Sequence, residues 1–152
     1  MRRTDREITD REEIDRILSS QTVCRLGVCF EDVPYVVPMN YGYSGGALYF
    51  HSATSGQKID MITRNPEVCF EIEGEAEIVP KDQACKWSTK YISIVGYGRI
   101  ELLKEANQKI EGLSVIMAQC SGTDAWEYEP SSIEKVLVMR LPIRSMSCKR
   151  AE

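Results

Sequence analysis

The sequence predicts a mainly β protein, a small antiparallel β-barrel of about six strands with helices over its ends. Segments rich in β-branched and aromatic residues recur from Thr22 to the C-terminal region. The connections at 31–34 and 44–46 are hairpin-like and too short for parallel crossovers. Helical patterns interrupt the strands. A doubly wound βαβ sheet is the alternative that these short connections disfavour.

The first half of the chain combines one helix with a three-stranded meander. Thr9 and Glu12 have the spacing of a capping box, and the helix that they begin is expected to end near Ser20. Its apolar face is expected to carry Ile14, Ile17 and Leu18. The three strands are expected at 22–30, 35–43 and 47–52. Pro38 cannot donate to a β-ladder, which predicts an edge strand or a bulge at this position.

The second half alternates helices and strands. A short helix is expected after Ser55, its N-cap, and a longer helix is expected over 104–120. The apolar stripe of the longer helix consists of Ile110, Leu113, Ile116 and Met117. Strands are expected at 66–79, 90–103 and 136–147, with loops at 80–88 and 121–132. Gly96 and Gly98 predict a bulge or a close backbone approach.

Length and composition indicate one domain spanning 1–152. The formal net charge is −4, and no basic tract or basic helix is present, which argues against nucleic-acid binding. There is no run of about 18 apolar residues, so no membrane span is expected. The charged segment 1–18 lacks the apolar core of a secretory signal, and a cytoplasmic location is therefore expected.

Six cysteines and a single histidine bear on metal and disulfide chemistry. There is no Cys-x-x-Cys pair, and one histidine cannot complete a Cys/His zinc site. Most of the cysteines stand in apolar, strand-like contexts, as Cys24, Cys29 and Cys69 do. We therefore expect reduced cysteines in the core, without a disulfide framework and without a metal site.

The segment HSATSGQK, from His51 to Lys58, concentrates groups that bind phosphate. A cation in the first turn of a helix opposes the helix dipole by about 0.3–1 kcal/mol, and a bound anion reverses this penalty. Lys58, the open amide groups at the helix start and the nearby hydroxyls would converge on a phosphate. A solvated loop with a surface lysine is the alternative. The spacing of a Walker A loop is absent.

His51 stands at the end of a strand, where an imidazole is either a structural hydrogen-bonding residue or a reactive group. An imidazole ordinarily titrates near neutral pH, so it can donate a proton or orient a substrate. No serine or cysteine arrangement in the sequence marks a nucleophilic triad. Both interpretations of His51 stay open at the level of these residues.

Together, these parts resemble a known family. The segments YVVPMNYGY (35–43), ALYFHSATSGQKID (47–60) and ACKWSTKYISIVGYGRIE (84–101) resemble the pyridoxamine 5'-phosphate oxidase-like, FMN-binding split β-barrels. Within these, the chain is most similar to the nitroimidazole-reductase, or Nim-type, resistance group, which its charged N-terminal segment also fits. The resemblance extends over nearly the whole chain. It implies a split-barrel homodimer with FMN between the subunits.

The resemblance also implies a cofactor site. The residues that would line the flavin, those of 36–40 mostly by their backbone, are Val36, Val37, Pro38, Met39, Asn40, Phe50, His51, Ser52 and Ser93. Ser55 and Lys58 would bind the phosphate, and Trp87 would cover the ring or the subunit boundary. In the Nim-type group, a histidine at the place of His51 is associated with the reduction site. His51 is therefore the catalytic candidate.

The chain also departs from the parent oxidases. These place an arginine–lysine pair at the phosphate, and arginine and tryptophan residues near the C-terminus for the pyridoxal substrate. Here the phosphate segment is SGQK (55–58) and the C-terminal segment reads MRLPIRSMSCKR, which argues against pyridoxamine 5'-phosphate oxidase activity itself. The resemblance implies an FMN-dependent reductase of a small acceptor, such as a nitroimidazole or another nitroaromatic. The alternatives are a non-catalytic flavin or haem binder, with His51 as an iron ligand, and a deazaflavin-dependent reductase.

Overall fold

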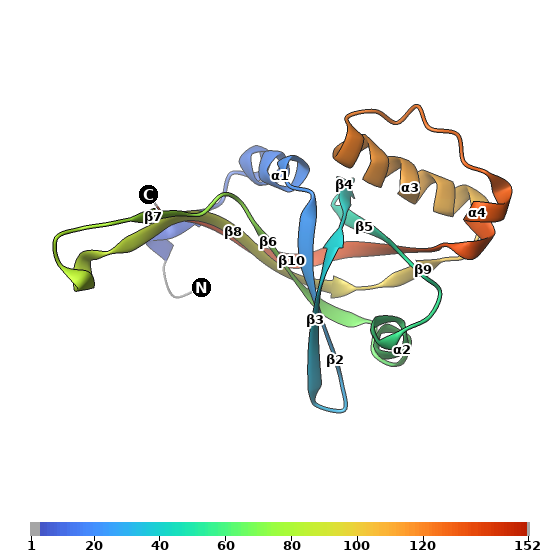
Figure 1. Ribbon diagram of the computed structural model, residues 1–152, viewed down its shortest axis with the longest axis horizontal. Coiled ribbons are helices and arrows are strands. Elements are labelled where there is room, and N and C mark those ends of the chain that lie inside the picture. Colours follow the sequence, from blue (N-terminus) through green and yellow to red (C-terminus); the bar gives the residue numbers. More distant parts are fainter. Residues whose placement is uncertain (1–3, 152) are drawn as a thin grey trace.

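The computed structural model describes residues 4–151, which fold around one curved antiparallel sheet (Figure 1). The strands are β1 (Glu7–Ile8), β2 (Val23–Phe30), β3 (Val33–Asn40), β4 (Gly42–Ser44), β5 (Ala47–Ser52), β6 (Glu67–Glu73), β7 (Glu77–Val79), β8 (Ser88–Arg99), β9 (Glu101–Leu103) and β10 (Leu137–Ala151). The helices are α1 (Arg11–Ser20), α2 (Gln57–Arg64), α3 (Ala106–Ser121) and α4 (Pro130–Lys135), with short 3-10 turns η1 (Thr4–Arg6) and η2 (Ala84–Lys86). Among these residues, no helix is long and apolar enough to cross a membrane.

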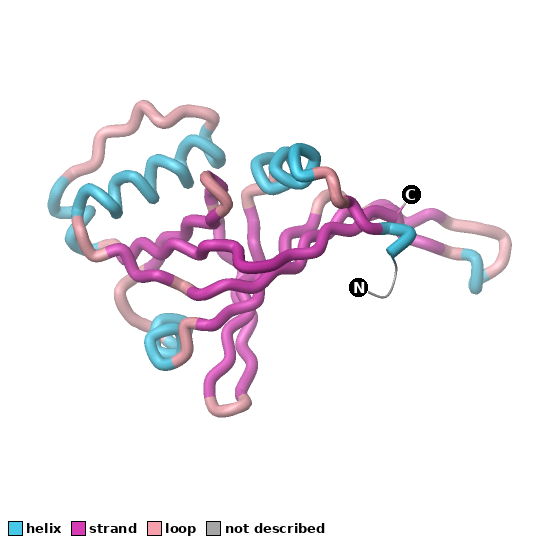
Figure 2. Tube along the Cα trace, turned by 180° about the vertical axis from the view of Figure 1, so that it is seen from behind, coloured by secondary structure: helices cyan, strands magenta, loops and turns pink. Residues whose placement is uncertain are grey.

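The strand order brings two separated strands together. It runs β3-β2-β6-β8-β10-β5-β4, and β1, β7 and β9 are short additions to β10 or β8. β3 and β5 stand near opposite ends of this order, yet they lie in contact without a ladder between them. We call this boundary between β3 and β5 the seam. The sheet thus forms a barrel that is split at the seam, and the predicted fold class is confirmed (Figure 2).

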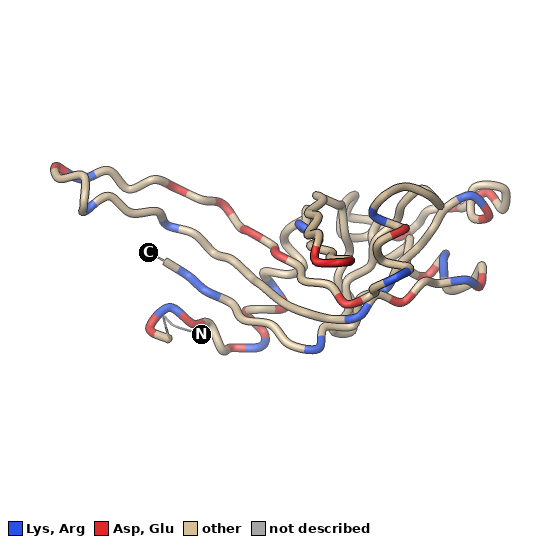
Figure 3. The backbone as a smooth tube through the Cα atoms, turned by 90° about the horizontal axis from the view of Figure 1, so that it is seen from below, with Lys and Arg blue, Asp and Glu red and all other residues tan. Residues whose placement is uncertain are grey.

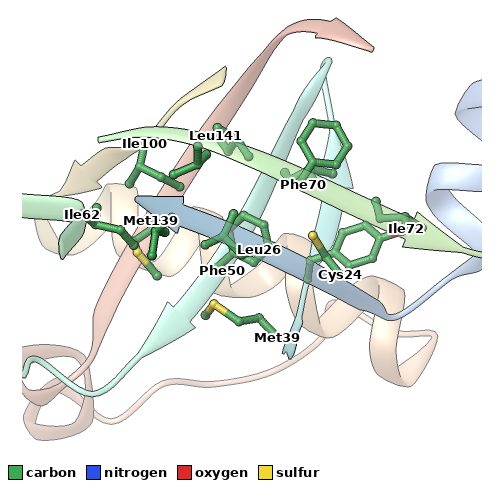
Figure 4. Close-up of a cluster of buried hydrophobic side chains, with 14 of the residues drawn as sticks. Cys24, Leu26, Met39, Phe50, Ile62, Phe70, Ile72, Ile100, Met139 and Leu141 are labelled. Carbon is green, nitrogen blue, oxygen red and sulfur yellow. The ribbon is translucent and has the colours of Figure 1, made fainter. Parts of the chain in front are cut away.

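The barrel interior fixes both sides of the seam (Figure 4). Phe50 of β5, Met39 of β3 and Leu26 of β2 belong to one buried cluster. Ile62 of α2 enters the same cluster, so the helix that follows β5 is held against the barrel. Burying one such side chain contributes about 1.5–3 kcal/mol to stability. The core therefore gives β3, β5 and α2 fixed positions relative to one another.

The described residues form ten strands where the sequence predicted about six, because three predicted segments are each interrupted once and the short strand β1 is added. At Tyr41, between β3 and β4, the side chain turns inward and its hydroxyl donates to the carbonyl oxygen of Leu18 at 2.6 Å. Between β8 and β9, the amide of Ile100 donates to the carbonyl oxygen of Pro66 at 2.9 Å. The sequence also missed α4, which begins at Pro130 inside a predicted loop, although proline suits the first helical position.

Both predicted N-caps are displaced by one residue. Asp10, not Thr9, caps α1, because its carboxylate accepts from the amides of the second and third helical residues at 2.9 and 3.3 Å. Gly56, not Ser55, precedes α2, with a φ of +122° that favours glycine. No side chain caps α2 within the described residues. The amides of Ile59 and Asp60 donate to the carbonyl oxygen of Gly56, and those of Gln57 and Lys58 stay open among the described residues.

Helix α3 packs against β4, β5 and β10 through a glycine that the apolar pattern did not reveal. A Cβ on Gly112 would stand 2.8 Å from a methyl carbon of β10. Ile116 of the predicted stripe is buried, while Leu113 and Met117 are half-buried. Ile110 is 39% exposed, so the prediction was wrong there. The helix turns a face containing this glycine toward the sheet, which lets the backbones approach closely.

Three backbone predictions are confirmed. Pro38 lies in β3, which ends the strand order and is therefore an edge strand. The ring of Phe70 fills the space beside Gly96, and the backbone of Pro142 fills the space beside Gly98. A shift in register between β8 and β10 at residues 143–145 marks a β-bulge in this region.

The cysteines only partly follow their prediction. Cys24 and Cys148 are buried, whereas Cys29, Cys85 and Cys120 are exposed. All six thiols, Cys69 included, are free. The prediction of core positions was wrong for the exposed three. Cys29 faces outward on an alternating strand, Cys85 lies in the short turn η2, and Cys120 lies at the end of α3.

Candidate functional site

The seam brings together two of the strands that were predicted to line a ligand. β3 carries Val36–Asn40 and β5 carries Phe50–Ser52, and the strands lie in contact. Among the described residues, no ladder joins them, so the edge of β3 at the seam is not used by a neighbouring strand. An unpaired strand edge presents backbone donors and acceptors to a ligand or to water. This edge suits a flat ligand that hydrogen-bonds along its rim.

Alternation along the two strands decides which side chains can reach a ligand. Met39 and Phe50 are buried in the core, and Val37 packs against it, so they can offer a ligand only their backbone. Val36 is 63% exposed, and Asn40 is also exposed. The Asn40 amide donates to the carbonyl oxygen of Thr22 at 3.1 Å, which fixes its orientation. Backbone contacts were the predicted mode for this strand, and the structure is compatible with them.

His51 points outward from β5, one residue after the buried Phe50. Its Cα partner in the ladder is Val138 of β10. Within the described residues, no hydrogen bond or ion pair holds the exposed imidazole, so its nitrogens can bond to water or to a ligand. The same residues contain no group of three or more His, Cys, Asp or Glu side chains arranged for a metal ion. The imidazole is therefore accessible to a small molecule beside the seam.

The start of α2 collects the predicted phosphate-binding groups. β5 ends at Ser52 and α2 begins at Gln57, so the connection is short. Lys58 lies half-buried in the first turn, and burial lowers the pKa of its ammonium group. No carboxylate pairs with it among the described residues. Ser55 is exposed and is not engaged as a cap, so its hydroxyl is available.

A cation at this position is otherwise unfavourable. The positive end of the helix dipole and the partial burial both disfavour the charged ammonium of Lys58. An anion at the start of α2 would remove both penalties and would also satisfy the open amides. The arrangement therefore fits a phosphate or a similar anion.

Ser93 and Trp87 lie away from the seam of their own chain. Ser93 is in β8, which β2 and β6 separate from β3. Trp87 lies beyond β8 at the end of a projecting ribbon, where its indole is 54% exposed. Its Nε1 donates to the carbonyl oxygen of Lys81 at 2.7 Å. These two predicted contacts would join a cofactor at the seam only if they came from a second copy of the chain.

The structure adds an outward-facing groove that the sequence analysis missed. Its volume is about 460 Å³, and it crosses β3, β2 and β6. Val36, Gly27 and Cys69 line its apolar part, and Arg25 and Glu71 form part of its charged rim, with Nη1 2.9 Å from Oε2. These residues come from three strands that are distant in sequence. Only the ladder register aligns them, and a local pattern carries no such signal.

Comparison with solved structures identifies the fold as a split β-barrel. A proposed 5-nitroimidazole antibiotic resistance protein of Bacteroides thetaiotaomicron is 32% identical, with a TM-score of 0.84 over 95% of this chain and 86% of that chain. A FAD-binding protein of Mesorhizobium loti is 26% identical, with a TM-score of 0.72 over 97% and 98% of the two chains. A FAD- and haem-binding protein of Mycobacterium smegmatis shares the fold at 17% identity, with a TM-score of 0.86 over 97% and 74% of the two chains.

Sequence comparison gives the family. The sequence model of the pyridoxamine 5'-phosphate oxidase family matches residues 10–150. The chain therefore belongs to this family. The predicted resemblance, including its nitroimidazole-resistance branch, is confirmed. An uncharacterized protein of Rhizobium meliloti (strain 1021), RA0666, is 40% identical over 65 residues. That match spans 43% of this chain and 42% of the relative.

Proposed function

We propose that the protein is an FMN-dependent oxidoreductase that reduces a small acceptor, and that the acceptor is a nitroimidazole or another nitroaromatic. The observation that carries the proposal is the half-buried Lys58 at the open start of α2, directly after the strand that bears His51. The family and the likeness to the Bacteroides resistance protein support a flavin and a nitroaromatic acceptor. The departures at 55–58 and at the C-terminus disfavour pyridoxamine 5'-phosphate as the substrate.

The chain's contribution to cofactor binding follows from the site. Lys58, the open amides of α2 and the Ser55 hydroxyl would bind the phosphate through charge-assisted hydrogen bonds. The backbone of 36–40 would orient the ring system along the seam. Bound flavin would supply the electron transfer to the acceptor, and the protein would position both partners.

His51 would act on the acceptor. A nitro group takes up protons as it is reduced, so a proton donor within hydrogen-bond distance of its oxygen accelerates the step. The exposed imidazole on the outer side of β5 has no competing partner among the described residues. We assign His51 the role of proton donor to the acceptor. Lys58, at the other end of the connection between β5 and α2, would bind the phosphate.

We further propose a homodimer with FMN at the subunit boundary. In one chain, Ser93 and Trp87 lie away from the seam, so a shared site would let a second copy provide them. Charges on the outer face of the sheet are already paired, as in Arg144 with Glu67 at 2.8 Å. Paired charges cost less to bury than unpaired ones, which suits a face that a second subunit covers.

A non-catalytic flavin or haem binder is the second candidate, and His51 is the residue that favours it. Histidine is a common axial ligand of haem iron, and a fold relative from Mycobacterium smegmatis binds FAD and haem. A deazaflavin-dependent reductase on the same barrel is the third. These candidates differ in the ligand that accompanies the purified protein.

The ligand test combines absorption with mass spectrometry of the extracted ligand. FMN predicts two broad bands in the near-UV and blue, together with the mass of FMN. A single sharp Soret band would favour the haem binder, and the mass of a deazaflavin would favour the third candidate. Either result would contradict the FMN assignment.

A further inference from the structure

The chain exposes more surface than a monomer of its size. Its accessible area is 9413 Å² at a mass of 17.3 kDa. A monomeric globular protein of this mass exposes about 7,800 Å² by the general scaling of area with mass. The excess, about 1,600 Å², is roughly twice the 800 Å² that each partner buries in a standard interface. This shape is typical of a subunit rather than of an isolated domain.

Much of the unusual shape lies in a two-stranded ribbon that projects from the barrel (Figures 1 and 2). We call residues 75–90 the arm. β7 pairs with β8 within it and with no other described strand. Every residue of the arm except Val79 is exposed. A two-stranded hairpin without further packing is at best marginally stable in water, so the arm needs a surface to pack on.

One face of the arm is apolar and continues the outer face of the barrel. Ile78 stands opposite Thr89 in the ladder and is 65% exposed. Along β8, Thr89 shares its face with Tyr97 by alternation, and Tyr97 is 49% exposed. Trp87 precedes Thr89 by two residues and therefore lies on the same face by alternation. The hydrogen bond from its indole to the carbonyl oxygen of Lys81 orients the ring within the arm. The apolar strip therefore runs from the body of the sheet out along the arm.

Charge marks the opposite face of the arm as the solvated one. Lys90 and Glu77 are ladder partners, and Nζ and Oε2 are 3.6 Å apart. Both side chains are at least half exposed. In Figure 3, acidic positions follow one another along one strand of the arm, and basic positions lie on the other strand. The pair of Glu77 and Lys90 spans the two strands on this face, and the opposite, apolar face is left as the surface for contact.

We propose that the arm clasps a second copy of this chain, with Ile78 and Trp87 as the anchoring side chains. This inference rests on the proposed homodimer and deepens it. The strip on the arm continues the face that carries Tyr97, so a copy docked on that face lies within reach of the arm. In a two-fold dimer both arms take part, so each anchoring contact occurs twice. The clasp accounts for both the excess area and the exposed anchors.

The first test needs no substitution. Hydrogen exchange of the full-length protein is measured at amides 77–79 and 88–90, at concentrations above and below the dimer dissociation constant. The clasp predicts protection of these amides only in the dimer. Equal exchange at both concentrations overturns it, whether the arm is permanently solvated or folds back on its own barrel.

The second test compares the double variant Ile78→Ser/Trp87→Ser with Glu77→Ser, which changes the solvated face of the same arm. Sedimentation equilibrium should show the dimer dissociation constant raised at least about 100-fold in the double variant, because aromatic and apolar anchors dominate interface energies. Glu77→Ser should change it less than about 5-fold, as expected for an exposed ion pair. An unchanged dissociation constant in the double variant overturns the clasp.

The flavin content of the same samples separates this inference from the proposed function. A dimer that retains flavin but fails both arm tests would overturn only the clasp. A protein that is monomeric at every concentration and holds flavin would overturn the clasp and the shared site together, while leaving flavin binding intact. A dimer with a protected arm and no flavin would support the clasp and count against the function.

Discussion

The ring of Phe70 occupies the space where a Cβ on Gly96 would stand. The two residues are ladder partners on β6 and β8, and Phe70 is fully buried. On the other side of the same glycine, Cβ of Met146 on β10 would lie 3.0 Å away. The absence of a side chain at residue 96 therefore lets a large core ring lie across the middle of the sheet.

Gly96→Ala should accordingly destabilise the protein. A methyl group would displace the Phe70 ring from a closely packed core, at a cost of about 1–3 kcal/mol. Gly27→Ala is the control, since the nearest atom to its Cβ would be 3.5 Å away, an ordinary contact. Urea unfolding measures both variants. Equal stabilities would show that Phe70 can move aside without cost.

Lys58→Ala should weaken FMN binding. Removing a charge-assisted hydrogen bond to the phosphate costs about 1.5–3 kcal/mol, or roughly 10–150-fold in the dissociation constant. Lys104→Ala removes an exposed lysine far along the chain and should leave the affinity unchanged. Fluorescence titration with FMN compares the two. An affinity in Lys58→Ala equal to that of the wild type would remove Lys58 from the site.

His51→Ala should leave FMN binding nearly intact and slow the reduction of the acceptor. The rate should fall about 10²–10⁴-fold if the imidazole donates a proton in the rate-limiting step. His51→Gln keeps a hydrogen-bonding group but cannot act as an acid, so its rate should fall as that of His51→Ala does. Stopped-flow traces of flavin reoxidation provide the rates. Indistinguishable traces for wild type and both variants would make His51 a structural residue.

Stability should fall in alkaline solution through the buried thiol of Cys24. Burial raises the pKa of this group to about 12, above the value of about 8.5 in an unfolded chain. The contribution of the protonated thiol to the free energy of unfolding is therefore fully present below about pH 8.5. It is lost as the pH rises toward 12, because the unfolded chain releases the proton first. Cys24→Ala should show a shallower decline in melting temperature between pH 8 and pH 10. Parallel declines in both proteins would contradict this assignment.

The barrel and its helices were predictable because their signals are local. Alternating apolar residues, hairpin turns and helical spacing predicted the strands and the helix around the seam. Pro38 predicted that its strand lies at the edge of the sheet. The helix starts were displaced by one residue, because Asp10 and Thr9 both resemble caps and only backbone geometry distinguishes them. Ile110 was wrongly predicted to be buried, because the face of α3 that meets the sheet contains Gly112, and a glycine does not register in an apolar pattern.

The candidate site was less accessible to sequence reasoning, because its parts meet through long-range pairing. The ladder register alone aligns Arg25, Gly27 and Cys69 in the outward groove. The resemblance named Ser93 and Trp87 as cofactor contacts, but nothing local to them reveals that they lie away from the seam of their own chain. A second subunit, which no single-chain pattern encodes, is what would unite these groups.

The account is tested most directly by anaerobic stopped-flow spectroscopy of the holoprotein. The protein is reduced chemically and mixed with a 5-nitroimidazole, and the recovery of the blue flavin band is followed. The account predicts recovery at a rate that rises with acceptor concentration, together with loss of the nitro absorbance. A reduced flavin that stays reduced in the presence of the nitroimidazole, but reoxidises when air is admitted, would contradict the proposed nitroaromatic reductase.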